Sequence, residues 1–123
     1  MSDKELIEHA LKAQKLAIAP YSNYKVGAAI LSEDKEITIG FNIESKAYPT
    51  TICAERVAIF SDLTKEKKKF ISLAVVTDNQ GTPCGSCRQI IHEYAGDIKI
   101  LIADNKNNYY ETTTNNLLPN PFG

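Results

Sequence analysis

The chain has 123 residues, enough for one domain with a buried core, so we expect a single domain over residues 1–123. Hydrophobic residues make up 43% and charged residues 24%, and 14 basic against 15 acidic side chains leave a formal charge of −1. This balance argues against a nucleic-acid partner, and no apolar stretch reaches the ~20 residues that a membrane helix needs. The N-terminus carries acids and lacks the apolar centre of a signal peptide, so a cytoplasmic protein without a membrane partner is expected.

The N-terminal segment predicts an amphipathic helix. Ser2 and Glu5 fit the capping-box pattern S-x-x-E, in which each side chain satisfies a backbone N–H of the first turn. Apolar residues then recur largely on one helical face as far as Ile18. Pro20 is expected to stop this helix.

The rest of the chain predicts alternating strands and helices. First come strands at 25–32 and 36–43 that form a hairpin, followed by a loop at 44–50. A helix over 52–63, capped by Thr51, leads to a buried strand at 70–77. The chain then forms a helix over 84–95, a buried strand at 98–103, an edge strand at 109–114 and an irregular tail. The basic run at 65–70 is interpreted as a solvated loop. Strand–helix–strand alternation implies a partly parallel sheet. The predicted fold is therefore α/β, a three-layer α/β/α sandwich with a mixed five-stranded sheet.

Three cysteines carry the main chemical signal. Cys84 and Cys87 stand three positions apart in "PCGSC", a spacing shared by redox dithiols and metal sites, and so few cysteines argue against a disulfide framework. Cys53 and Cys84 are both expected at the start of a helix, where the helix dipole favours the thiolate that binds metal. Two helices that begin at one sheet edge bring the three thiols together. Three protein ligands with a fourth position for water are the pattern of a catalytic zinc.

A carboxylate follows Cys53 by two residues. Glu55, next to a zinc-bound water, is placed to take its proton and hand it to a substrate nitrogen. Two other interpretations stay open on these residues alone. One is a thioredoxin-like dithiol of Cys84 and Cys87, and the other is a closed structural zinc site, for which His92 is the nearest fourth ligand.

Several stretches together match one known family. The zinc-deaminase signature, H-x-E or its cysteine variant followed by P-C-x-x-C, is present as "CAE" at 53–55 and "PCGSC" at 83–87. With "PYSNYKVGAAI", "GFNIESKAYPTTICAER", "PCGSCRQ" and "LLPNPF", nearly the whole chain resembles the small homotetrameric cytidine deaminases. The resemblance implies one Zn²⁺ per chain and hydrolytic deamination of cytidine, and of deoxycytidine, to uridine or deoxyuridine plus ammonia in pyrimidine salvage.

The resemblance also implies a role for each site residue. Glu55 is the proton shuttle, and Arg56 offsets the charge of the thiolates through hydrogen bonds to sulfur. The implied zinc ligands are Cys53, Cys84 and Cys87. The implied substrate contacts are Asn42 and Glu44 at the ribose, Tyr24 beside the base, Ala54, and also Tyr48 and Phe122, which reach into a neighbouring subunit's site. The expected assembly is therefore a homotetramer with shared active sites.

The sequence departs from the family pattern around the substrate. Tyr24 stands where Phe is commoner, so its hydroxyl needs a partner. Lys46 stands where a small residue is usual; we expect it to point into solvent, the alternative being a contact with an anionic group at the 5′ end of the sugar. A deaminase of a modified, antibiotic-type cytosine nucleoside is the second candidate, although "FNIE" at 41–44 favours the plain nucleoside. From another class, a non-catalytic zinc or redox protein is the main alternative.

Overall fold

The structure, a computed structural model, describes residues 1–65 and 69–123. Over these residues five strands form one mixed sheet in the order β2-β1-β3-β4-β5, in which only β3 and β4 are parallel neighbours. The strands are β1 (Gly27–Ser32), β2 (Ile37–Phe41), β3 (Phe70–Thr77), β4 (Lys99–Asp104) and β5 (Tyr109–Thr113). The helices are α1 (Asp3–Gln14), the 3-10 helix η1 (Tyr48–Thr50), α2 (Ala54–Leu63), α3 (Gly85–Ala95) and α4 (Thr114–Leu117).

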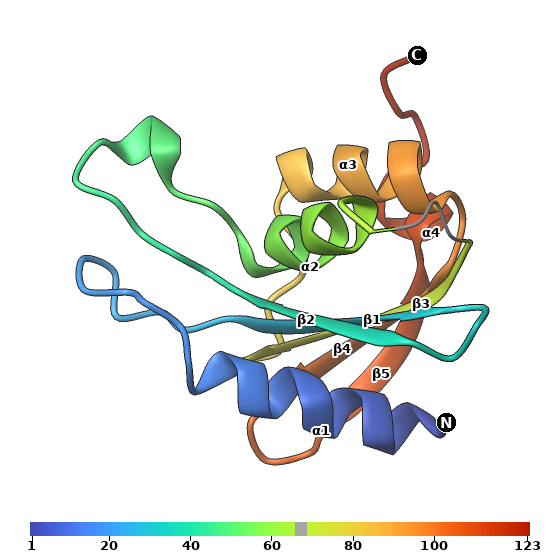
Figure 1. Cartoon of the computed structure of the whole chain (residues 1–123), viewed down its shortest axis with the longest axis horizontal. Helices are drawn as coiled ribbons and strands as arrows, with labels where there is room; N and C mark the ends of the chain where they lie inside the picture. The colour runs from blue at the N-terminus through green and yellow to red at the C-terminus, as the bar shows by residue number, and fades with distance from the viewer. Residues whose placement is uncertain (66–68) are drawn as a thin grey trace.

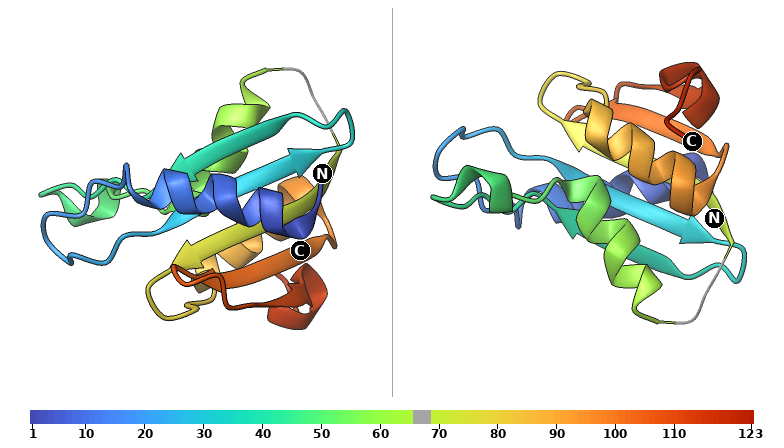
Figure 2. Two further views of the ribbon diagram at one scale, coloured as in Figure 1. Left: turned by 90° about the horizontal axis from the view of Figure 1, so that it is seen from below. Right: turned by 90° about the horizontal axis from the view of Figure 1, so that it is seen from above.

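Helices cover both faces of the sheet (Figure 1). Helix α1 lies on one face, and α2 and α3 lie side by side on the other (Figure 2). In β1, Ala28 and Ile30 belong to the core under α2 and α3, whereas Ala29 and Leu31 belong to the core under α1. Because both faces are covered, β1 is buried throughout. The predicted three-layer sandwich with a mixed five-stranded sheet is confirmed. No helix of the described residues is long and apolar enough to cross a membrane.

The strand directions bring two helix N-termini together. Strand β1 is antiparallel to both of its neighbours, so β2 and β3 run in the same direction. Helix α2 follows β2 and α3 follows β3 along the chain, and both therefore begin at the edge where those strands end. Gly40 allows α2 to pack closely on β2, because a Cβ there would stand 2.3 Å from the carbonyl oxygen of Ala54.

The predicted end of the first helix was wrong. Helix α1 ends at Gln14 rather than near Pro20, and Ile18 is 51% exposed. The backbone of Ile18 instead pairs with the segment after β2: its N–H donates to Asn42 at 3.0 Å, and its carbonyl accepts from Glu44 at 2.9 Å. A tertiary pairing thus overrides the helical pattern of the sequence.

Two further predictions about local structure need correction. Thr51 does not cap α2; its hydroxyl accepts the N–H of Ser45 at 3.0 Å, and Cys53 is the N-cap residue. The tail, predicted to be irregular, begins within the short helix α4, whose N-cap residue Thr113 accepts the N–H of Asn116 at 3.2 Å. The proposed solvated loop at 65–70 lies partly outside the described residues, at 66–68.

Candidate metal centre and its cavity

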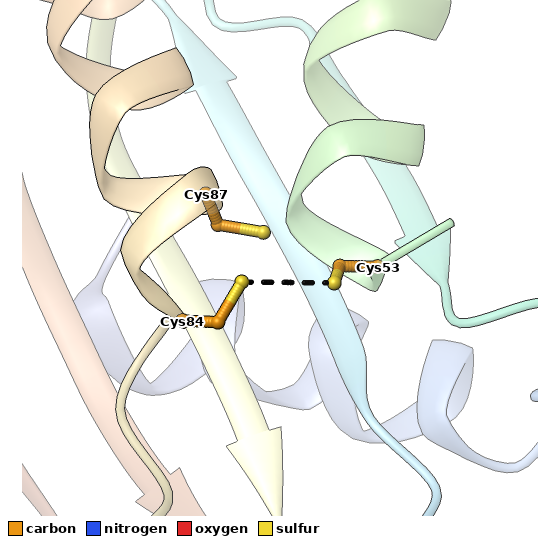
Figure 3. Close-up of side chains that lie close together, drawn as sticks. All are labelled: Cys53, Cys84 and Cys87. Atoms are coloured by element: carbon orange, nitrogen blue, oxygen red, sulfur yellow. Dashed lines mark hydrogen bonds between the residues drawn. The ribbon is translucent and has the colours of Figure 1, made fainter. Parts of the chain in front are cut away.

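Three cysteine sulfurs point toward one another at the N-termini of α2 and α3 (Figure 3). Cys53 and Cys84 are the N-cap residues of α2 and α3, and Cys87 lies in the first turn of α3. The sulfurs of Cys53 and Cys84 are 3.9 Å apart, and all three sulfurs lie within 4.8 Å of one another. All three thiols are free of disulfide bonds.

The spacing and chemistry of these sulfurs fit a zinc ion. Two thiolates bound tetrahedrally at ~2.3 Å from zinc stand roughly 3.8 Å apart, which is close to the distance between Cys53 and Cys84. The positive ends of two helix dipoles also meet at this point. Within the described part of the chain no other Cys, His, Asp or Glu joins the cluster, and His92 is not part of it. The cluster therefore has the three protein ligands of a catalytic site rather than the four of a structural one.

Hydrogen bonds make Cys53 much more acidic than Cys87. The Cys87 thiol, together with Arg56, lowers the pKa of Cys53 to about 5. The same contact and burial raise the pKa of Cys87, which is fully buried. Arg56 Nη2 donates to Cys53 Sγ at 3.3 Å, and this bond raises the pKa of Arg56 in turn. The structure thus brings Arg56 to the sulfur that ionises more readily.

Glu55 is buried beside the sulfurs. It is the second residue of α2, is only 4% exposed, and lines the same cavity as Cys53 and Cys84. Burial raises its pKa to about 7, with a further contribution from the charge on Cys53. A carboxyl group with a pKa near neutrality is suited to both accepting and releasing a proton.

A cavity of about 260 Å³ opens next to the metal centre. Its lining includes five of the predicted site residues besides Cys53 and Cys84: Tyr24, Asn42, Glu44, Ala54 and Glu55. It also includes residues outside the predicted site, among them Ser22, Thr77, Gly81 and Thr82. Their one signal in the sequence is position, because Ser22 lies inside "PYSNY" and the other three lie close before "PCGSC". A larger hollow of about 510 Å³ beside α1 contains none of the three sulfurs.

The two predicted ribose-binding side chains are fixed by local hydrogen bonds. Glu44 accepts the N–H groups of Tyr21 at 2.9 Å and Ser22 at 3.1 Å, and also the Ser22 hydroxyl. These bonds, that of the Ser22 hydroxyl above all, lower the pKa of Glu44. Asn42 donates from Nδ2 to the Tyr24 carbonyl at 2.9 Å, and its Oδ1 accepts a backbone N–H of the same segment at 3.0 Å. Both side chains therefore have defined positions on the cavity wall.

Three residues discussed for substrate binding lie outside this cavity. Tyr48 in η1 is 76% exposed, Phe122 in the tail is 88% exposed, and Lys46 is exposed as well. The backbone of Phe122 is nevertheless held by Gln89 of α3, whose amide donates to the Phe122 carbonyl and accepts the Phe122 N–H, both at 3.0 Å. The Phe122 ring thus projects from a fixed backbone without entering the cavity of its own chain.

A three-cysteine metal centre, a buried carboxylate and an adjoining cavity on an α/β sandwich define the class of zinc-dependent hydrolases. Residues 1–103 match the family described as the cytidine and deoxycytidylate deaminase zinc-binding region. The chain is 43% identical to a cytidine deaminase of Sporosarcina psychrophila, over 99% of this chain and 92% of that protein. It is 37% identical to a cytidine deaminase of Halalkalibacterium halodurans, over 99% of this chain and 95% of that protein.

The fold comparison agrees with the sequence comparisons. The crystal structure of cytidine deaminase from Burkholderia pseudomallei matches with a TM-score of 0.95 at 37% identity, covering 99% of this chain and 100% of that one. The chain therefore belongs to the zinc-binding family of cytidine and deoxycytidylate deaminases. The resemblance to cytidine deaminases is confirmed, whereas the homotetramer and the roles of individual residues stay predictions.

Proposed function

We propose that this protein catalyses the zinc-dependent hydrolysis of cytidine, and of deoxycytidine, to the corresponding uracil nucleoside and ammonia. One observation carries this proposal: three cysteine sulfurs lie within 4.8 Å of one another, and two of them, those of Cys53 and Cys84, share the wall of one cavity with the buried Glu55. Relatives named cytidine deaminase, similar over nearly the whole chain, support cytidine as the substrate.

The chemistry is divided between the metal and Glu55. Cys53, Cys84 and Cys87 hold one Zn²⁺, which when bound supplies the Lewis acidity that activates water for attack at C4 of the cytosine ring. Glu55 accepts one proton of the attacking water and delivers it to N3. It then takes the remaining proton from the hydroxyl group now on C4 and passes it to the amino group, so that the C4–N bond breaks, ammonia leaves and a carbonyl group remains at C4. The raised pKa of Glu55 suits both directions of transfer.

The sugar and the base contact different walls of the cavity. The ionised Glu44 accepts hydrogen bonds from ribose hydroxyls, and such charge-assisted bonds are stronger than neutral ones. Asn42 adds a contact through the remaining acceptor capacity of its amide oxygen. Tyr24 and Ala54 pack near the base. The defined positions of Asn42 and Glu44 support this arrangement.

The active form is proposed to be a cytoplasmic homotetramer of closed symmetry that serves pyrimidine salvage. Tyr48 and Phe122 each complete the site of a neighbouring subunit. Their exposure of 76% and 88% supports this role, because large apolar rings on a fixed backbone are better buried against a partner than left in water.

The test combines product and metal analysis on one sample. Purified protein is mixed with cytidine, uridine is followed by ultraviolet absorbance, ammonia is measured enzymatically, and zinc is measured by mass spectrometry. We expect one ammonia per uridine and about one zinc per chain. Zinc without ammonia release would instead indicate a structural metal, and faster turnover of a modified cytosine nucleoside would indicate the second candidate substrate.

A further inference from the structure

The hydroxyl group of Tyr24 joins two loops that form walls of the cavity. Tyr24 lies between α1 and β1, and its Oη donates a hydrogen bond to Asn79 Oδ1 at 2.7 Å. Asn79 belongs to the loop between β3 and α3, which leads directly to Cys84. Tyr24 on the first loop and Gly81 on the second both line the cavity.

The acceptor of this hydrogen bond is itself anchored to the sheet. The hydroxyl of Thr77, which is 3% exposed at the end of β3, donates to the same Asn79 oxygen at 3.3 Å. It also accepts the N–H of Gly81 at 2.6 Å. The Tyr24 hydroxyl is therefore attached to a loop whose position is fixed by a buried side chain.

Gly81 and Tyr24 fit each other as a pair. A Cβ on Gly81 would stand 2.4 Å from Tyr24 Oη, whereas real Cβ atoms essentially never come within 3.0 Å of such an atom. The next nearest atoms, on Thr77 and Asn79, are at 3.3 and 3.5 Å. The backbone of Gly81 does not adopt a positive φ, so its conformation is open to other residues. Of these three atoms only the Tyr24 hydroxyl oxygen is closer than 3.0 Å to a Cβ at position 81, although the Thr77 hydroxyl would also have to move by a few tenths of an ångström.

We infer that the hydrogen bond between Tyr24 and Asn79 sets the width of the nucleoside cavity, with Tyr24 as a positioning residue for the base and Gly81 as its required counterpart. The inference rests on the proposed function for its substrate. The hydroxyl is committed to Asn79 and acts by holding the ring of Tyr24 against the loop that carries Cys84. A phenylalanine at this position cannot make this link.

The first test removes the hydroxyl group. Tyr24→Phe is expected to raise KM for cytidine about three- to tenfold, the effect of losing one neutral hydrogen bond, and to leave kcat nearly unchanged because the sulfurs and Glu55 are untouched. Asn79→Ala should act in the same way, and the double variant should be no worse than either single one. Tyr110→Phe removes a hydroxyl on the edge strand β5 and serves as the matched control with unchanged KM. A wild-type KM in Tyr24→Phe would overturn the inference.

The second test adds a methyl group at the contact. Gly81→Ala in the wild-type background is expected to raise KM more than Tyr24→Phe does, because the methyl displaces the hydroxyl and breaks its bond to Asn79. In the Tyr24→Phe background the same change should add little. This rescue distinguishes a specific contact from general damage to the loop. Equal harm from Gly81→Ala in both backgrounds would overturn the inference.

Melting temperatures separate the inference from the proposed function. Gly81→Ala should lower the melting temperature of the wild type and lower it less in the Tyr24→Phe background, whatever the substrate is. If wild type does not deaminate cytidine but this pattern appears, the proposed function fails and the contact between Tyr24 and Gly81 stands. If cytidine is deaminated but neither KM nor melting temperature shows the rescue, the inference fails and the function stands.

Discussion

Arg56 donates a hydrogen bond to the sulfur of Cys53 at 3.3 Å from the same helix that presents Cys53 at its N-terminus. Three thiolates exceed the charge of a divalent zinc ion and leave a formal charge of −1. A guanidinium group and two helix N-termini beside the sulfurs offset this excess. Arg56 is thus expected to tune the metal without binding it.

Replacing Arg56 tests this charge balance. Arg56→Ala is expected to lower kcat/KM about 10- to 100-fold, as is typical for residues that orient metal ligands, and to move the acidic limb of the pH–rate profile upward. Arg56→Lys keeps the charge but not the planar donor group, so it should lose less activity. The measurement is the pH–rate profile of both variants at matched zinc content. An unchanged pH–rate profile would show that the two helix N-termini offset the thiolate charge without Arg56.

The acidity of Cys53 predicts that its thiol reacts before that of Cys87 when zinc is removed. The pKa of Cys53 is lowered from about 9 to about 5, so its reactive thiolate forms as the pH rises through about 5 and is lost below that value. Cys87 is buried with a raised pKa and should stay unmodified. Metal-depleted protein is alkylated with iodoacetamide at a series of pH values, and peptide mass spectrometry then measures the extent of modification of Cys53 and of Cys87. Added zinc should protect Cys53, and earlier alkylation of Cys87 would contradict the prediction.

The exposed ring of Phe122 predicts complementation between subunits. Phe122→Ala should raise KM about tenfold or more. In the proposed tetramer the ring is buried against the neighbouring site, and burying a phenylalanine side chain contributes about 1.5–3 kcal/mol of favourable free energy. Mixing Phe122→Ala subunits with Glu55→Gln subunits should restore activity, since each supplies the group that the other lacks. Activity of the mixed assemblies no higher than the sum of the two parents would reject shared sites.

Variants at Gln89 and Glu93 form a matched pair that also tests whether Phe122 contributes to substrate binding. The Gln89 amide holds the backbone of Phe122 and also donates to Glu93 at 2.9 Å. Gln89→Ala should therefore reproduce part of the Phe122→Ala defect in KM. Glu93→Ala removes only the second contact and should leave KM unchanged.

The parts of the fold that follow from local pattern were predictable from the sequence. The apolar runs at 70–77 and 98–103 became β3 and β4, because a strand covered on both faces needs apolar side chains on both. The end of α1 and the N-cap of α2 were predicted wrongly. Both depend on backbone pairing of Ile18 and Ile52 with Ile43, which no local pattern reveals.

The residues of the site also fall into those that could be predicted from the sequence and those that could not. The three cysteines and Glu55 could be named from the sequence because metal binding and proton transfer need particular residue types at particular spacings. The partners of Tyr24 could not be named, since Asn79 and Gly81 meet it only after the sheet has brought two distant loops together. Residues whose role is positional therefore require the structure.

The most direct measurement compares wild type with Glu55→Gln, a substitution that keeps the shape of the side chain and removes its ability to transfer protons. Zinc content and the rate of uridine formation from cytidine are determined on the same preparations. Both proteins should contain about one zinc per chain, while the variant should lose activity by orders of magnitude because proton delivery to N3 and to the leaving amine depends on Glu55. Near-normal turnover by a zinc-loaded Glu55→Gln variant would contradict the proposed mechanism.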